Sequence, residues 1–303
     1  INGKLIAPIG KGYLDNINPS TGEVYSLLPN SDQKDFLLAL SSAKKAFSGW
    51  SKETKKYRYN ILMKLARELE KNCEKLALAE SLDNGKPLWL AKKMDIPRCA
   101  ENIRFFATAS LHFDSKVHTM NRDAINYTLR SPIGVVGCIS PWNLPLYLLT
   151  WKIAPALAAG NVVIAKPSEV TPYTAYLFSK ICIKSGVPPG VINILHGTGE
   201  GVGQEIVKHK DVPVISFTGG TNTGKKINEI CAQKFKKVSL EMGGKNPTIV
   251  FSDSNFEKAI ETTLRASFLN QGQICLCGSR IFVEKDLYPK FKRAFIKEVK
   301  KIV

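Results

Sequence analysis

The spacing of apolar residues changes part-way along this chain of 303 residues. In the first part, apolar residues recur every three or four positions, which predicts helices over residues 31–47 and 54–82 and another helix after Pro87. Pro97 is expected to interrupt or kink that last helix, because a proline inside a helix removes a backbone donor. These helices are expected to act as a scaffold.

The segment 114–131 has a different pattern. It is polar, and Ile125, Tyr127 and Leu129 occupy alternate positions. Alternation of this kind is typical of extended backbone. The segment therefore predicts a hairpin-like excursion.

In the rest of the chain, short apolar segments alternate with helical ones. Strands are expected over 134–139, 162–166, 191–195, 212–217 and 237–241, and helices over 171–185, 199–208 and 221–231. This order predicts a parallel α/β sheet that is covered by helices on both faces. Ligands bind such sheets beyond the carboxyl ends of the strands, where the chain places Asn143, Lys166, Gly197, Gly219 and Glu241.

The composition limits where the protein can work. A hydrophobic content of 44% is enough to bury a substantial core. No apolar run approaches the ~20 residues of a membrane span, and residues 1–30 lack the basic start and apolar centre of a secretory signal. The seven cysteines are an odd number scattered along the chain, which favours a reducing compartment. We therefore expect a cytoplasmic protein without a membrane partner.

The formal charge of +17 raises the question of nucleic-acid binding, because a basic surface attracts phosphate. The lysines, however, occur in pairs along the whole chain, mostly in predicted helices. Such pairs usually belong to solvated helix faces, and no nucleic-acid-binding motif accompanies them. No nucleic-acid partner is expected.

Residues 268–280 carry the most informative chemical signal. They place Cys275 in a loop flanked by glycine and glutamine between two apolar segments, where a thiolate can act as a nucleophile. In the preceding segment 239–247, Glu241 ends an apolar run and two glycines follow, so a carboxylate base is available. The structural alternatives are a buried cysteine and a glutamate that opens a turn. Cys277 competes for the role of nucleophile, but one Cys-x-Cys pair without further ligands does not make a zinc site, and no metal is expected.

Two other loops carry candidate binding groups. Asn143 lies between Pro141 and Pro145, so its amide is on a stiff loop of the kind that an oxyanion donor requires. Residues 161–169 form a predicted strand that ends in a charged pair, and residues 217–224 form a strand that runs into a helix N-terminus. That second turn is a candidate cradle for a dinucleotide.

These motifs together resemble the aldehyde dehydrogenase superfamily. They occur in the order and approximate spacing of that superfamily, as Pro141-Trp142-Asn143, Lys166-Pro167-Ser168-Glu169, Phe217-Thr218-Gly219, Glu241-Met242-Gly243-Gly244-Lys245 and Gly272-Gln273-Ile274-Cys275. The similarity runs from Ile1 to about Lys285. Within the superfamily, residues 94–98, 144–152 and 274–277 are most similar to the enzymes that oxidise 2-aminomuconic semialdehyde in the kynurenine route. Oxidation of retinal or of a broad range of aldehydes is the alternative.

The resemblance implies an aldehyde dehydrogenase-like α/β fold. A Rossmann-type NAD-binding domain would comprise residues 1–113 and 133–244, an oligomerisation hairpin residues 114–132, and the N-terminal part of a catalytic domain residues 245–303. Members of the family continue through a Glu-x-Phe-Gly element, so the chain is expected to be C-terminally truncated and inactive alone. A catalytically silent isoform that binds full-length subunits is the alternative. At full length, a homo-oligomer, either a dimer or a tetramer, is expected.

The resemblance also implies the chemistry. The thiolate of Cys275 attacks the aldehyde carbon, and the oxyanion accepts hydrogen bonds from the Asn143 amide and the Cys275 backbone N–H. Hydride passes to NAD, and water activated by Glu241 hydrolyses the thioester. The implied NAD contacts are Ile139, Ser140, Pro141, Trp142, Lys166, Ser168, Glu169, Gly199, Phe217, Thr218, Gly219, Gly220, Thr223, Glu241, Met242 and Gly243.

Several of these residues bear on the choice of cofactor and substrate. Lys166 and Glu169 would bind the adenosine ribose, and the Glu169 carboxylate would repel a 2′-phosphate and so favour NAD over NADP; a surface salt bridge is the alternative. Gly220 departs from the serine that is common in the family. Arg98 would anchor a substrate carboxylate, with Asn143 as the other substrate-binding residue. The alternative for Arg98 is a role in capping the kinked helix.

Overall fold

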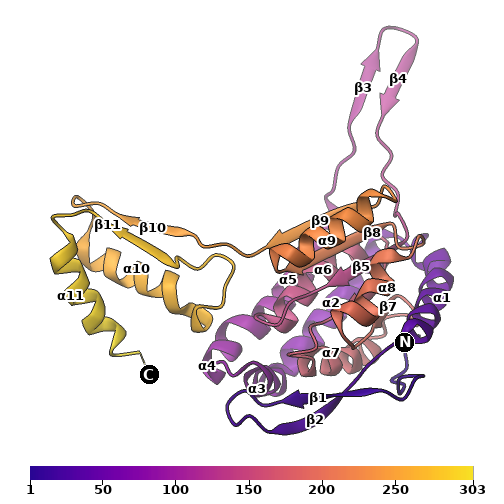
Figure 1. Cartoon of the computed structure of the whole chain (residues 1–303). Coiled ribbons are helices and arrows are strands. Elements are labelled where there is room, and N and C mark those ends of the chain that lie inside the picture. Colours follow the sequence, from indigo (N-terminus) through magenta and orange to yellow (C-terminus); the bar gives the residue numbers. More distant parts are fainter. Residues whose placement is uncertain (303) are drawn as a thin grey trace. The chain divides into compact units, whose positions relative to one another are not determined.

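The computed structural model describes residues 1–302, and these divide between Leu240 and Glu241 into two compact units. Each unit has its own hydrophobic core. The larger unit is an α/β layer structure (Figure 1), as the alternation of apolar segments predicts. No helix among residues 1–302 combines the length and the apolar character needed to cross a membrane.

A five-stranded sheet is the centre of the larger unit. Its strands follow the order β7-β6-β5-β8-β9, with β5 at Val135–Ile139, β6 at Val162–Lys166, β7 at Ile192–Ile194, β8 at Val214–Gly219 and β9 at Lys237–Met242. The pairs β7/β6, β6/β5 and β5/β8 are parallel. All residues of β5 and β6 are buried, because helices cover both faces. The predicted parallel α/β sheet is confirmed.

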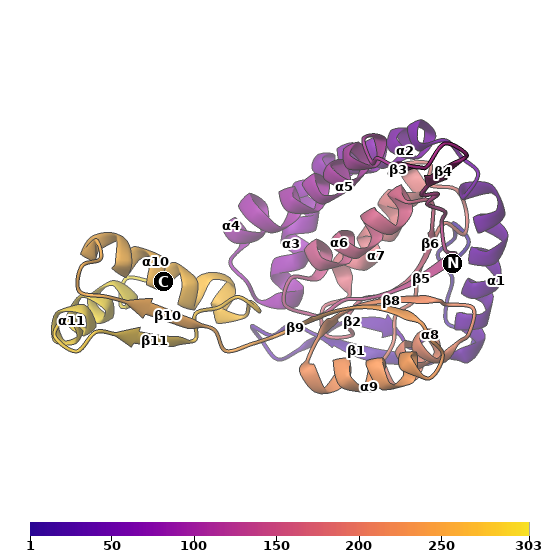
Figure 2. The same ribbon diagram turned by 90° about the horizontal axis from the view of Figure 1, so that it is seen from above.

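Helices cover this sheet in layers (Figure 2). On one face lie α6 (Pro145–Ala158) and α7 (Tyr173–Lys184), and on the other α8 (Gln204–Lys208) and α9 (Thr221–Ala232). Two more helices, α2 (Lys55–Lys71) and α5 (Ile96–Leu111), pack on one another and on α6. The long α1 (Gln33–Trp50) contacts β5 and β6.

The helices of the first part differ from the prediction at two places. The predicted helix 54–82 is broken at Asn72, which ends α2 and precedes α3 (Cys73–Asn84). The Glu68 carbonyl accepts hydrogen bonds from both the Asn72 side chain at 2.7 Å and the Asn72 amide at 3.2 Å, so this side chain competes for the last turn of α2. The helix expected after Pro87 consists of α4 (Leu88–Leu90), a π-helical turn (Ala91–Asp95) and α5, with Pro97 in the first turn of α5.

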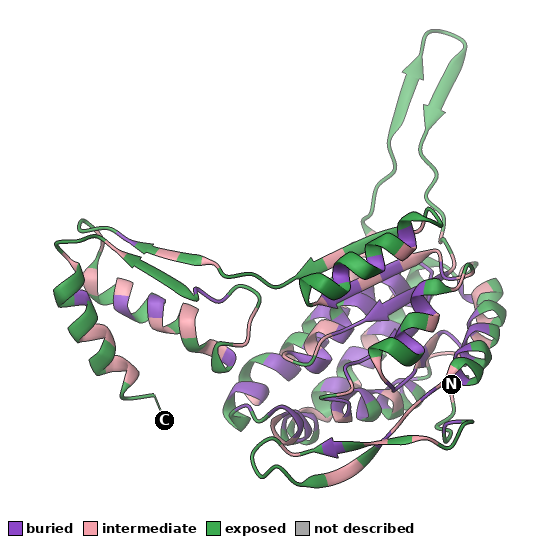
Figure 3. Ribbon diagram, in the orientation of Figure 1, coloured by how far each residue is buried: buried purple, intermediate pink, exposed green. Residues whose placement is uncertain are grey.

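Two hairpins accompany the sheet. The first, β1 (Tyr13–Ile17) with β2 (Val24–Pro29), was not among the predicted elements. The second, β3 (Val117–Met120) with β4 (Ala124–Tyr127), confirms the excursion predicted for 114–131. All residues of β3 and β4 are exposed (Figure 3).

The smaller unit is a short α/β structure. Strands β10 (Pro247–Val250) and β11 (Arg280–Val283) pair in parallel, joined through α10 (Phe256–Phe268) and a 3₁₀ turn (Leu269–Gly272), and α11 (Tyr288–Val299) follows. Val250, Ile260 and Phe291 form its small core.

Candidate active site

The carboxyl ends of three neighbouring strands place the predicted site residues at one edge of the sheet. Ile139, the last residue of β5, lies opposite Lys166 of β6 and opposite Phe217 of β8. The loops that follow these strands therefore start side by side, and they contain most of the predicted cofactor contacts. The amide of Ser140 donates to the Lys166 carbonyl at 3.1 Å, which extends the pairing by one residue.

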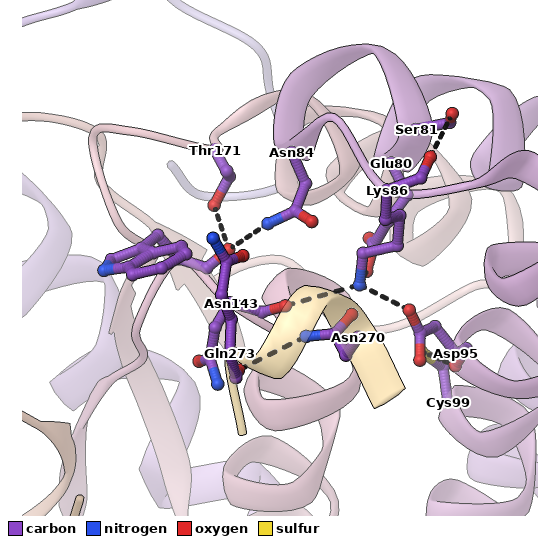
Figure 4. Close-up of polar contacts among 11 residues, drawn as sticks. Glu80, Ser81, Asn84, Lys86, Asp95, Cys99, Asn143, Thr171, Asn270 and Gln273 are labelled. Atoms are coloured by element: carbon purple, nitrogen blue, oxygen red, sulfur yellow. Dashed lines mark hydrogen bonds and ion pairs between the residues drawn. The ribbon is translucent and has the colours of Figure 1, made fainter. Parts of the chain in front are cut away.

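The loop between β5 and α6 is held through its backbone. The carbonyl of Trp142 accepts hydrogen bonds from Asn84 Nδ2 at 2.9 Å and from Thr171 Oγ1 at 3.1 Å. The next carbonyl, that of Asn143, accepts from Lys86 Nζ at 3.3 Å (Figure 4). The three donors come from segments on either side of the loop. The stiffness that the prolines predicted for this loop is thus reinforced by side chains from outside it.

Lys86 belongs to a buried ionic cluster. Its Nζ lies 2.5 Å from Asp95 Oδ2 and 3.5 Å from Glu80 Oε1, and all three residues are buried. Burial raises the pKa of Glu80 to about 7, against the attraction of Lys86, and it also raises the pKa of Asp95. The cluster therefore holds a proton more readily than exposed carboxylates do.

Lys166 and Glu169 form an ion pair at the end of β6. The Lys166 side chain is 3% exposed and the Glu169 side chain is 37% exposed, and Lys166 Nζ lies 2.8 Å from Glu169 Oε2. The pair is therefore buried on the lysine side and open to solvent on the glutamate side. The ammonium also donates to the carbonyls of Pro167 and Gly197, both at 2.9 Å. Burial lowers the pKa of Lys166. Burial alone would raise the pKa of Glu169, but the Lys166 charge and hydrogen bonds outweigh it and lower that pKa.

Backbone amides of neighbouring residues form further hydrogen bonds next to the Lys166-Glu169 pair. The Gly199 amide donates to Glu169 Oε1 at 3.3 Å, and the Ser168 hydroxyl accepts from the Val170 amide at 3.2 Å. Gly197 has φ +140°, and a Cβ there would lie 3.1 Å from Val202 Cγ1. A glycine is therefore required for the chain to turn at this point.

The turn from β8 into α9 is open. Gly220 is the N-cap residue of α9, no side chain caps the helix, and a Cβ on Gly220 would have nothing within 4 Å. Gly219 differs, because a Cβ there would lie 2.5 Å from the Phe217 ring. Thr223, in the first turn of α9, is exposed. The first amides of the helix are thus accessible to a ligand.

Lys152 of α6 donates hydrogen bonds to two side chains of β8, the strand that leads into this turn. Its Nζ donates to Thr218 Oγ1 at 2.7 Å and to Ser216 Oγ at 3.4 Å, and its side chain is buried. Lys152, Asn84, Lys86 and Thr171 were not among the predicted site residues. The only available signal was the polar run around Asn84-Gly85-Lys86 directly before a proline.

The end of β9 carries the candidate base. Glu241 and Met242 are the last residues of β9, and Gly243 follows; all three are exposed. The boundary between the two compact units falls directly before Glu241. The Glu241 carboxylate is therefore open to solvent near the end of this strand.

The smaller unit presents Cys275 on a strained loop. Asn270, Gln271 and Gly272 have consecutive positive φ angles of 52°, 59° and 71°, which cost energy in residues other than glycine and recur at functional sites. Cys275 is exposed, whereas Cys277 is buried.

Hydrogen bonds to backbone carbonyls hold this loop in place. Asn246 Nδ2 donates to the carbonyls of Cys275 at 2.8 Å and Cys277 at 3.2 Å. The Gly278 amide donates to the Ala266 carbonyl at 2.9 Å, and a Cβ on Gly278 would lie 2.1 Å from Thr248 Oγ1. The thiol at position 275 is thus presented to solvent from an anchored backbone.

Arg98 lies in the first turn of α5. Its Nη1 is 3.1 Å from Glu101 Oε2, and both side chains are more than half exposed. It also borders a hollow of about 220 Å³, whose other lining residues are Lys93, Met94, Asp95, Pro97, Glu101 and Tyr147. Arg98 can therefore exchange Glu101 for an anionic ligand at modest cost.

Among residues 1–302, no group of three or more histidine, cysteine, aspartate or glutamate side chains is arranged to hold a metal ion.

Comparison with known proteins shows which family the chain belongs to. The model of the aldehyde dehydrogenase family matches residues 7–303. The 2-aminomuconic semialdehyde dehydrogenases of Mus musculus and Homo sapiens are 53% and 52% identical to the chain, over 95% of its length and 60% of theirs. The solved NAD+ complex of an aldehyde dehydrogenase from Bacillus cereus has a TM-score of 0.98 at 36% identity, covering 100% of this chain and 62% of that one. The chain thus spans about 60% of the length of these relatives, and it belongs to the aldehyde dehydrogenase family.

Proposed function

We propose that the protein oxidises an aldehyde to a carboxylic acid with NAD as the hydride acceptor and Cys275 as the nucleophile. The observation that carries this proposal is the edge shared by β5, β6 and β8, where an anchored asparagine loop, an ion pair of the buried Lys166 with Glu169, and an uncapped helix start lie together. The chain spans about 60% of its relatives' length, so this activity is proposed for the whole protein.

The residues at this edge fit a dinucleotide. Ser140 Oγ is buried and has no hydrogen-bond partner within residues 1–302, so it is available to a bound group. The uncapped start of α9 suits a pyrophosphate, because helix N-termini attract anions. Glu169 suits the hydroxyls of an adenosine ribose. The solved structures that resemble the chain include NAD+ complexes, which supports NAD as the cofactor.

The chain's own residues then perform the following steps. The Cys275 sulfur forms a bond with the aldehyde carbon, and the developing oxyanion accepts hydrogen bonds from the Asn143 side-chain amide and the Cys275 backbone N–H. NAD, when bound, supplies the acceptor for the hydride that leaves this carbon. The thioester that remains on Cys275 is attacked by water, and Glu241 takes the proton of that water. The carbon–sulfur bond breaks, and the carboxylic acid is released.

Glu169→Gln is expected to weaken NAD binding roughly five- to ten-fold, because it replaces a charge-assisted hydrogen bond of about 1.5–3 kcal/mol with a neutral one of about 0.5–1.5 kcal/mol. It should also relax discrimination against NADP, since no negative charge then opposes a 2′-phosphate. Titration calorimetry with NAD and NADP measures both effects in the purified protein.

Glu298→Gln is the matched control, because Glu298 forms a Lys-Glu pair of the same spacing with Lys301 on the surface. Melting curves separate lost stability from lost affinity, since Glu169→Gln also removes a partner of the buried Lys166. An unchanged NAD to NADP ratio in the Glu169 variant would reduce the Lys166-Glu169 pair to a structural role.

For the substrate, we infer 2-aminomuconic semialdehyde or a closely related semialdehyde that carries carboxylates, as in the kynurenine route. This inference rests on the names of the mouse, human, cattle and zebrafish relatives, which are 50–53% identical to the chain. A carboxylate-bearing substrate needs a cationic anchor, and Arg98 at the hollow beside Tyr147 is the proposed one.

Arg98→Met is expected to reduce the catalytic efficiency with a carboxylate-bearing semialdehyde roughly ten- to a hundred-fold and to leave that with hexanal almost unchanged. The reason is that an arginine anchor acts only on substrates that carry the anion. Steady-state NADH formation with both substrates tests this. Arg104→Met is the control, since Arg104 lies on the same helix and pairs with Glu70 on the surface. Equal losses on both substrates would assign Arg98 to the helix rather than to the substrate.

We also propose that the protein is cytoplasmic and forms a homo-oligomer, either a dimer or a tetramer. The exposed hairpin supports self-association, because apolar side chains lie along both of its strands, including Val117, Met120, Ile125 and Tyr127. Exposed apolar groups concentrated on one element are typical of interaction surfaces. Sedimentation equilibrium of the protein and of a hairpin variant with Ile125→Ser and Tyr127→Ser would measure the assembly state.

A further inference from the structure

The cluster beneath the asparagine loop has no part in the steps above, although it is the most completely buried ionic group in the larger unit. Lys86 is 1% exposed, and its ammonium lies between the carboxylates of Glu80 and Asp95. Burying such a group is costly, and replacing it by apolar side chains often leaves stability unchanged or improves it. A role other than stability is therefore worth seeking for Lys86.

The geometry of the loop indicates what that role is. Peptide planes on both sides of the Asn143 Cα are held: the carbonyl of Trp142 by Asn84 and Thr171, and the carbonyl of Asn143 by Lys86 (Figure 4). When both flanking peptide planes are held, φ and ψ of the residue between them are determined. The direction of its Cα–Cβ bond follows from these angles, and so the position of the side-chain amide is restricted.

The ammonium suits this task better than a neutral donor. A hydrogen bond from a charged donor is about twice as strong as one between neutral groups. The ammonium is itself held by Asp95 at 2.5 Å and by Glu80 at 3.5 Å. Asp95 lies in the π-helical turn before α5, and Glu80 lies in α3, so two separate elements locate the donor. The Ser81 hydroxyl also donates to the Lys86 carbonyl at 2.6 Å and holds its backbone.

We propose that Lys86 is a positioning residue for aldehyde oxidation, which acts by fixing the Asn143 backbone so that the Asn143 amide meets the oxyanion. Asn84 and Thr171 hold the other flank of the same residue. The proposal rests on the proposed function, because it assigns Lys86 a role through the oxyanion donor. Misplacement of a catalytic group by about 1 Å can cost about a hundred-fold in rate.

The test compares variants in two backgrounds. K86M/D95N removes the ammonium and its nearest carboxylate together, so Glu80 alone remains of the three buried charged groups. We expect its kcat to fall roughly ten- to a hundred-fold, while the KM for aldehyde and the Kd for NAD change less than about three-fold, as expected for an interaction that acts in the transition state. In an Asn143→Ala background, the same double substitution should lower kcat by less than about two-fold, because its target is gone.

Three controls keep the outcomes distinct. Asp95→Asn alone keeps the Lys86 donor and should retain more activity than K86M/D95N. Lys184→Met removes the lysine of a surface pair with Glu68 and should retain full activity. Thr171→Val removes one donor to the Trp142 carbonyl and, as a mild substitution, serves if the double variant does not fold; it should give a smaller loss of kcat that also disappears in the Asn143→Ala background.

Hydrogen exchange gives a readout without catalysis. Peptides that cover residues 141–146 should exchange faster in K86M/D95N and Thr171→Val than in Lys184→Met. Equal fold-losses of kcat with and without Asn143, or unchanged exchange and kcat in both variants, would overturn the proposal. Full activity of Asn143→Ala itself would instead overturn the oxyanion role within the proposed function.

Discussion

Replacing Cys275 by alanine is expected to abolish aldehyde oxidation, with a loss of roughly a thousand-fold or more, because the proposed mechanism forms the thioester on this sulfur. Cys277→Ala should retain most of the activity. The two thiols lie two residues apart, but Cys275 is exposed, whereas Cys277 is buried and its amide donates to the Ile274 carbonyl at 3.0 Å. NADH formation at 340 nm measures both variants.

Alkylation provides the independent measurement. Iodoacetamide should modify Cys275 first in the native protein, and mass spectrometry of the digested protein identifies the labelled peptide. Cys73→Ala is the control for a cysteine of intermediate exposure in the larger unit. An active Cys275→Ala together with an inactive Cys277→Ala would show that the nucleophile has been assigned to the wrong residue.

The central sheet could be predicted from the sequence because each strand carries its own signal. Strands β5 and β6 are short, apolar and rich in β-branched residues, and they lie between turns, which distinguishes them from amphipathic helices. The residues that follow them are polar, and the sheet brings those residues to one edge. The part of the site that depends on strand ends was therefore predictable from local patterns.

The N-terminal hairpin β1/β2 was harder to predict. Its strands are largely exposed, and β1 buries only Asn16, a polar residue. Asn16 is held by long-range partners, since its Nδ2 donates to Asp83 Oδ1 at 2.9 Å across 67 residues. A strand stabilised by such contacts lacks the apolar alternation that identifies strands in a sequence. Helix α6 was missed for a different reason, because its two prolines, Pro145 and Pro155, obscure the helical pattern.

The ionic cluster was missed because its members have no common motif. Glu80, Lys86 and Asp95 are spread over three local segments, and the carbonyl that Lys86 binds is 57 residues further on. Charged residues in a helical region usually face solvent, so sequence alone favours the opposite location for all three. Only the folded arrangement shows that they are buried together beneath the loop of Asn143.

Glu241→Gln is expected to arrest the enzyme after the thioester has formed. Hydride transfer from the thiohemiacetal needs no base at position 241, whereas hydrolysis of the thioester needs a group that takes the proton of water. Glutamine has the same shape as glutamate but cannot take that proton, so the steady-state rate should fall roughly a hundred- to ten-thousand-fold. The first turnover should remain fast.

Rapid mixing with saturating NAD and aldehyde distinguishes these two phases. The variant should release a burst of NADH of up to one equivalent per active site, followed by slow turnover, and the acylated Cys275 peptide should accumulate for detection by mass spectrometry. Glu229→Gln, an exposed substitution on α9, should show neither change. Because Glu241 is an exposed residue near the end of β9, its replacement is not expected to alter the fold, and an unchanged melting temperature would support that. Loss of the burst itself would mean that Glu241 acts before hydride transfer, as the base that generates the thiolate of Cys275.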